Sequence, residues 1–237
     1  MANGGSVAGA STAGLLRAAE IVGAISLATD LGTGQPLEHA LRTAILAARL
    51  GEFADASRME RSDAYYVALL HSFGCTSDST EATELYGDDI APRAAFALVD
   101  AGNPEEVGAY LATHVGRGRE PEVRDAMVAH ALEHGLELAQ ETFALHCEVA
   151  QRFAGWLGLS AGTHEALAFV FERWDGHGFP GLARGEQITL PARLLRRALL
   201  QFASRAPPVA SLLSALLMEE GGRGARPGLP PSRAALP

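Results

Sequence analysis

The chain has 237 residues, of which 48% are hydrophobic and 20% charged. This length and composition suit one larger domain or two small ones with a buried core, and they argue against a disordered protein. The net charge of −9 argues against general nucleic-acid binding, because such affinity comes from a basic face, but it is compatible with a local pocket for a small anion.

The chain lacks the sequence marks of a membrane or secreted protein. No apolar run reaches the ~18 residues that are needed to span a bilayer. Residues 1–14 are rich in Gly, Ala and Ser and lack the basic start and apolar core of a signal peptide, so they predict a flexible N-terminal arm. Cys75 and Cys147 lie in apolar surroundings and are expected to be free, buried thiols. These features predict a cytoplasmic protein.

Helical patterns cover the first part of the chain. Residues 15–29 carry apolar side chains at helical spacing, and a glycine-containing break follows them. Pro36 suits the first position of the next helix, on which His39 lies away from the one charged stripe and is predicted to point into the protein. The pair Ser62-Asp63 predicts an N-cap for a buried helix over residues 64–73.

The rest of the chain is also predicted to be helical, and it contains no convincing strand pattern. Thr163 is the predicted cap of the last of these helices. The composition after residue 200 is rich in Arg and Pro, which predicts an atypical, largely disordered tail over residues 201–237. The expected fold class is therefore all-α, with helices over residues 90–98, 104–114, 121–138, 141–157 and 164–173.

The most specific motif lies in residues 172–193. It contains Trp174-Asp175-Gly176, then Gly178-Phe179-Pro180, then Gly185-Glu186 and Leu190-Pro191-Ala192-Arg193. This run resembles the signature of the HD-GYP phosphohydrolases, a bacterial family. The resemblance implies an HD-domain-like helical bundle, here over residues 15–200, with a site for two or three metal ions. Many proteins that carry this signature hydrolyse cyclic-di-GMP.

The metal-ligand pattern that the resemblance implies is incomplete in this chain. His39, His71 and His146 match three of the expected histidines. Three imidazoles can hold one zinc, iron or manganese ion, but the usual cluster also needs a bridging carboxylate. The interpretations left open are one divalent metal or no cofactor. No aspartate lies in the stretch after Arg193, and the other ligand positions of the family hold Gln35, Ser72, Val170 and Phe171.

The signature loop has two interpretations. In the structural one, its glycines and Pro180 shape a turn-rich loop that Trp174 fastens to the core, and Phe179 keeps the ring of the family's tyrosine. In the functional one, its polar side chains contact a phosphate or a partner. The residues matched to the family are Trp174, Asp175, Gly178, Phe179, Pro180, Arg184, Glu186 and Arg193.

A second motif, His130-Ala131-Leu132-Glu133-His134, fits the H-x-x-E-H pattern of some zinc proteases. The pattern is short and acidic residues flank it, so we interpret it as a solvated face of a helix. It falls within residues 88–140, where members of the family have a shorter connection. This segment is therefore expected to be a helical insertion.

Two functional hypotheses remain. The leading one is a degenerate, non-catalytic HD-GYP-like module that acts in signalling and takes a cyclic dinucleotide or a partner protein as its ligand. Residues 28–35 and 74–78 favour it, because they are similar to phrases in a diverged set of bacterial proteins, some of which resemble regulators. The alternative is an active metal-dependent phosphohydrolase, of the cyclic-di-GMP phosphodiesterase type, with a reduced metal site.

Neither hypothesis involves nucleic acid or a membrane, and no catalytic residue is assigned. The Arg/Pro-rich end is also typical of a shifted reading frame or a truncation.

Overall fold

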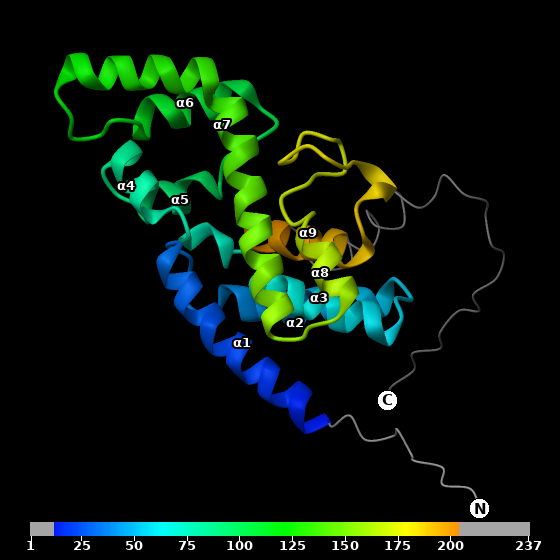
Figure 1. Ribbon diagram of the computed structural model, residues 1–237. Coiled ribbons are helices and arrows are strands. Elements are labelled where there is room, and N and C mark those ends of the chain that lie inside the picture. Colours follow the sequence, from blue (N-terminus) through cyan, green and yellow to red (C-terminus); the bar gives the residue numbers. More distant parts are fainter. Residues whose placement is uncertain (1–11, 204–237) are drawn as a thin grey trace, which may run out of the picture. The chain divides into compact units, whose positions relative to one another are not determined.

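The computed structural model describes residues 12–203, with side-chain surroundings for residues 18–202. The expectations for residues 1–11 and for almost all of the predicted tail lie outside this part of the chain. Figure 1 shows that the described segment is built from helices joined by loops. The elements, with η for a short 3-10 helix, are α1 (Thr12–Gly32), α2 (His39–Phe53), α3 (Arg58–Leu70), η1 (Gly74–Thr76), α4 (Ser79–Tyr86), α5 (Ala91–Phe96), α6 (Pro104–His114), α7 (Pro121–Trp156), α8 (Ala161–Leu167), η2 (Gly185–Gln187) and α9 (Leu190–Ala203).

The core is a helical bundle in which α2, α3 and α9 pack on one another. α1 lies against α2 and α3, while α8 packs on α3, α7 and α9. Burying a leucine or valine side chain contributes about 2 kcal/mol. The bundle is therefore the stable frame on which the loops and helix ends described below are placed. Its most buried large aliphatic side chains are Val22, Leu50, Val67, Leu69, Leu70, Leu167, Leu194 and Leu195.

The predicted all-α fold class is confirmed, since no strand occurs between residues 12 and 203. No helix in this range is long and apolar enough to cross a membrane. α6 begins and ends where the sequence predicts. Asn103 caps it by accepting a hydrogen bond from the backbone N–H of Glu105 at 3.0 Å, and Pro104 occupies its first turn.

Two of the predicted helix caps are wrong. α3 begins at Arg58, before the predicted Ser62-Asp63 pair, because Ser57 and Glu60 form a capping box. In it, Ser57 Oγ accepts from the backbone N–H of Glu60 at 3.2 Å, and a Glu60 carboxylate oxygen accepts from the backbone N–H of Ser57 at 2.8 Å. α8 is capped by Ser160, whose Oγ accepts from the backbone N–H of Thr163 at 3.0 Å.

Asp63 lies inside α3 and ties that helix to the start of α8. Its side chain is buried and accepts hydrogen bonds from the hydroxyls of Ser160 and Thr163, the second at 3.0 Å. A cap at this position would have left the carboxylate in solvent. The sequence pattern therefore identified a polar residue of structural importance but assigned it the wrong role.

α7 is one helix, although the sequence predicted separate helices over residues 121–138 and 141–157. In Figure 1 it changes direction partway along, and its first part lies with α6 away from α2, α3 and α9. α5 packs on α6, and α6 packs on α7. We call residues 88–140, which contain α5, α6 and the first part of α7, the projection.

Candidate functional site

Asp30, His39 and His71 come together at the ends of three bundle helices. Asp30 lies in the last turn of α1, His39 is the first residue of α2, and His71 directly follows α3. The ring centroids of the two histidines are 6.2 Å apart. Asp30 is 1% exposed, and its two carboxylate oxygens lie 3.1 and 3.3 Å from the backbone N–H of Ala40, which donates to them. Asp30 therefore satisfies an N–H in the first turn of α2 and brings a carboxyl group near His39.

Burial controls the protonation of all three side chains. It lowers the pKa of His71 to about 4 and lowers the pKa of His39, against the attraction of Asp30. Burial also raises the pKa of Asp30. His71 Nδ1 lies 2.7 Å from the carbonyl oxygen of Ala68, which can only accept. Nδ1 therefore carries the proton of the neutral ring, and Nε2 keeps a lone pair that can bind a cation or accept a hydrogen bond.

His146 belongs to a second polar cluster, with Asp78 and Arg93. His146 Nε2 lies 3.1 Å from Asp78 Oδ2, a short distance but poorly directed for a hydrogen bond. Arg93, in α5, donates from Nη2 to Asp78 Oδ1 at 2.6 Å. Burial alone would raise the pKa of Asp78, but His146 and Arg93 together hold it below its ordinary value. The cluster is therefore a partly buried ion pair that extends to an imidazole.

The structure brings His39 and His71 together but places His146 beside Asp78. Among residues 18–202, no group of three or more His, Cys, Asp or Glu side chains is arranged to hold a metal ion. A one-metal site made of all three histidines needs their ring nitrogens to converge on one point. Here Nε2 of His146 faces the carboxylate of Asp78. The three-histidine metal site stays a prediction.

The carboxylates of both clusters were not among the residues predicted for the site. Asp30 lies in residues 28–35 and Asp78 lies in residues 74–78, the two phrases that were singled out only for their similarity to other bacterial proteins. Each phrase supplies the acid that interacts with one of the predicted histidines, His39 or His146. A search for acidic partners within these phrases would have found both.

Glu172 anchors the signature loop. It is 2% exposed, and its Oε1 accepts from the backbone N–H groups of Gly181 and Leu182 at 2.9 and 2.6 Å. The Phe179–Pro180 peptide bond, which comes just before Gly181, is cis. Gly178 lies against the Glu172 backbone so closely that an added Cβ would come within 2.5 Å of the Glu172 Cα. The loop is thus folded back onto the residue from which it begins.

Aromatic rings fasten the same loop to α7. The ring of Phe179 stacks on that of Phe143, with centroids 4.9 Å apart and an interplanar angle of 18°. Phe171, at one of the positions matched to the His-His pair, also contacts Phe143, and Val170 is buried. The half-buried phenyl ring at the family's tyrosine position therefore packs against α7.

The polar signature residues are distributed around the outside of the loop. The Arg193 guanidinium lies over the Trp174 ring at 5.6 Å from its centroid, and Trp174 is 41% exposed. Asp175 accepts hydrogen bonds from Arg173. Arg184 and Glu186 are exposed. An aromatic face and exposed charges on the loop, with a cation from the start of α9 beside them, make chemistry that suits a planar anionic ligand.

Sequence comparison relates the chain to a protein of known activity. It is 26% identical, over 176 residues, to 3'3'-cGAMP-specific phosphodiesterase 3 of Vibrio cholerae serotype O1. The chain is related to a cyclic-dinucleotide phosphodiesterase. The aligned region covers 74% of this chain and 38% of that phosphodiesterase. No family model matches the chain.

Structural comparison finds a similar helical fold in a solved structure. A crystal structure of the cyclic GMP-AMP-specific phosphodiesterases of V. cholerae (V-cGAP3) superposes with a TM-score of 0.54 at 21% sequence identity. The match covers 86% of this chain and 44% of the other, so the chain spans less than half the length of either phosphodiesterase. The shared helical fold and the sequence relationship support the resemblance to HD-domain phosphohydrolases.

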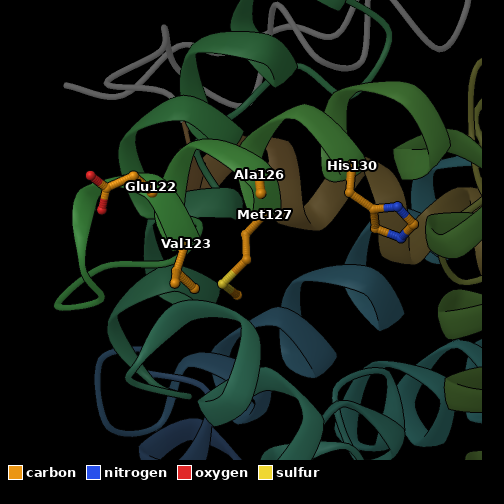
Figure 2. Close-up of a pocket in the computed structure, with 5 residues that line it drawn as sticks. All are labelled: Glu122, Val123, Ala126, Met127 and His130. Atoms are coloured by element: carbon orange, nitrogen blue, oxygen red, sulfur yellow. The ribbon is translucent and has the colours of Figure 1, made fainter.

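A shallow hollow lies on the first part of α7, and no residue of the signature loop is among those that line it. It has a volume of about 520 Å³, and its lining comes from one face of α7, as Figure 2 shows for Glu122, Val123, Ala126, Met127 and His130. None of the predicted site residues lines it. The rings of His130 and His134 have centroids 4.6 Å apart. The arrangement is that of a helix surface, as predicted for the H-x-x-E-H motif.

Removing the Glu172 side chain is expected to release the signature loop. In Glu172→Ala, the N–H groups of Gly181 and Leu182 lose their acceptor, and we expect a loss of about 2–3 kcal/mol in the free energy of unfolding. Glu172→Gln keeps a carbonyl oxygen at Oε1 and is expected to lose less than about 1 kcal/mol. Urea unfolding followed by helical circular dichroism measures both. Equal losses in the two variants would contradict the anchoring role.

Proposed function

We propose that the chain is an HD-GYP-type module that binds a cyclic dinucleotide without hydrolysing it. The observation that carries the proposal is that no group of three or more His, Cys, Asp or Glu side chains among residues 18–202 is arranged to hold a metal ion, while His146 lies beside Asp78, which binds Arg93. The relationship to a 3'3'-cGAMP-specific phosphodiesterase supports the choice of ligand class. The signature loop keeps its glycines, Trp174 and Arg184, which supports binding of a ligand by a chain that does not hydrolyse it.

The residues at the metal-ligand positions disfavour hydrolysis. Metal-assisted cleavage of a phosphodiester needs cations that lower the pKa of a water molecule and hold the phosphate oxygens. Of the carboxylates beside the predicted histidines, Asp30 accepts from the backbone N–H of Ala40 and Asp78 accepts from Arg93, so both are already engaged in hydrogen bonds within the chain. The position matched to a ligand histidine, Val170, is buried and apolar. These residues favour a site that does not assemble a metal cluster.

The side chains of the signature loop favour binding of a cyclic dinucleotide. A cyclic dinucleotide carries two flat bases and two phosphate anions. Trp174 offers a partly exposed ring for stacking, and Arg193 and the exposed Arg184 offer guanidinium groups that match phosphate geometry. The loop is anchored by Glu172 and Phe179, so these groups sit on a fixed frame. Preorganisation of this kind favours affinity.

Calorimetric titration and a turnover assay test the proposal together. We expect one molecule of 3'3'-cGAMP or cyclic-di-GMP to bind per chain with a Kd of about 1–10 µM, which corresponds to about 7–8 kcal/mol. Trp174→Ala should weaken binding about tenfold, the order of one lost base-stacking contact. Trp156→Ala, an exposed tryptophan on α7, is the matched control. Linear dinucleotide formed on incubation with Mn²⁺ or Fe²⁺ would contradict the non-catalytic assignment.

A second candidate function is metal-dependent hydrolysis through a reduced site. The approach of His39 to His71 beside the buried carboxyl of Asp30 favours it. His71 Nε2, with its lone pair, and the His39 ring would be the donors, with His146 as the third predicted ligand. Metal content decides between the two candidates: one bound Zn, Fe or Mn per chain, lost in His39→Ala, supports the enzyme.

A further inference from the structure

One arginine joins the signature loop to the projection. Arg173 donates from Nη2 to Asp175 Oδ2 at 2.6 Å and from Nε to Asp175 Oδ1 at 3.0 Å, both within the loop. Its Nη1 donates to Asp100 Oδ1 at 2.5 Å, and Asp100 lies in the projection between α5 and α6. The fork of the guanidinium therefore holds one carboxylate from its own loop and one, Asp100, that lies 73 residues away from Arg173 along the chain.

The projection is shaped to present Asp100. The backbone N–H of Asp100 donates to Glu106 in the first turn of α6, and Asp100 Oδ1 also accepts from the backbone N–H of Gly102 at 3.0 Å. An added Cβ at Gly102 would lie 3.2 Å from His177 Cβ and 3.5 Å from Arg173 Cζ. The turn before α6 is thus in van der Waals contact with the signature loop.

An apolar contact runs beside the ionic one. Phe96, in α5, lies against Phe143 of α7, with ring centroids 6.1 Å apart, and Phe143 in turn stacks on Phe179 in the loop. The contacts among these three rings do not depend on charge, so salt leaves them in place. The ion pairs of Arg173 are weakened by salt, because the side chains of Asp100 and Asp175 are 49% and 44% exposed. The signature loop is therefore joined to the projection by an apolar contact through Phe143, which salt does not weaken, and by the Arg173–Asp100 ion pair, which salt does weaken.

We infer that Asp100 is a latch through which the projection sets the position of the signature loop. When Asp100 holds Arg173, Trp174 and Asp175 are kept in the arrangement described above. When it releases Arg173, the outer part of the loop is free to move while Phe179 stays packed. The effect on a bound cyclic dinucleotide rests on the proposed function, but the latch itself does not.

Tryptophan fluorescence tests the latch without any ligand. The chain has two tryptophans, so Trp156→Phe leaves Trp174, inside the loop, as the reporter. In that background, Asp100→Asn should raise the acrylamide quenching constant of Trp174 by about twofold, the order expected when a loop loses a fixing contact. Asp125→Asn, an exposed residue of the projection on α7, is the matched control and should leave quenching unchanged.

The remaining measurements separate the latch from folding and from ligand binding. Arg173→Lys, whose compact ammonium cannot hold both carboxylates in a fork, should raise quenching as Asp100→Asn does, and circular dichroism checks that both variants keep their helices. With ligand, Asp100→Asn should weaken 3'3'-cGAMP binding about threefold through lost preorganisation. Unchanged quenching in Asp100→Asn, or an equal rise in Asp125→Asn, overturns the latch. If quenching rises but the parent chain binds no cyclic dinucleotide, the latch stands and the proposed function falls.

Discussion

Replacing Gly74 with alanine is expected to destabilise the folded chain by about 3 kcal/mol, at the upper end of the usual cost of overpacking. Gly74 begins η1, which packs on α7. An added Cβ at this position would lie 2.0 Å from the carbonyl oxygen of His146 and 2.6 Å from its Cα. These are backbone atoms of a long helix, so they cannot move aside as the end of a flexible side chain can.

The same substitution should also move Asp78 away from His146 in the second polar cluster. η1 leads directly to Asp78, so pushing η1 away from α7 draws Asp78 away from His146. Urea unfolding measures the stability, and Gly155→Ala is the control. Gly155 lies inside α7 with nothing within 4 Å of an added Cβ, so that change should raise stability by up to about 1 kcal/mol. A Gly74→Ala protein as stable as the parent would show that η1 does not pack this closely.

Lowering the pH is expected to destabilise the chain through His71. The pKa of His71 is about 4 in the folded protein and 6.5 when the ring is exposed, because burial disfavours the charged ring. Between these values the unfolded chain binds a proton that the folded chain does not. Stability therefore falls as pH decreases from 6.5 to about 4, by about 1.4 kcal/mol per pH unit and about 3 kcal/mol in all.

Comparison with a variant isolates this contribution from other groups that titrate in the same range. Asp30 works in the opposite direction, since its raised pKa lets the folded state take up a proton first, and His39 works in the same direction as His71. His71→Asn keeps a donor near the Ala68 carbonyl and removes the imidazole. Urea unfolding at intervals from pH 4.5 to 7.5 should show a shallower slope in the variant. Parallel slopes would mean that His71 takes up its proton over the same pH range in the folded chain as in the unfolded chain.

Local sequence signals predicted the parts of the fold that local forces decide. The first-turn proline and the Asn103 cap define α6, and both act within a few residues of the helix start. The predicted start of α3 was wrong, although the sequence contains the correct signal. Ser57 and Glu60 have the spacing of a capping box, which the Ser62-Asp63 pair does not have. α4 was not predicted. It is short and buries a single residue, Ala82, so its apolar pattern is too sparse to recognise.

The candidate site was predictable only where a motif names the residues. His39 and His71 were singled out individually, and the bundle brings their rings together. Their acidic neighbours depend on tertiary packing: Asp30 reaches α2 from the end of α1, and Asp78 reaches His146 across the contact between η1 and α7. No periodicity in the chain carries that information. The contact between Asp100 and Arg173 is equally invisible, because it joins two loops.

The contacts that the projection makes with the rest of the molecule bear on how this chain can evolve. A segment that only decorates a surface can be lost or exchanged among relatives without compensation. Here, loss of the projection would remove the ring of Phe96 from Phe143 and leave Arg173 with one carboxylate in place of two. The projection and the signature loop are therefore expected to change together over time, with paired substitutions at positions such as 100 and 173.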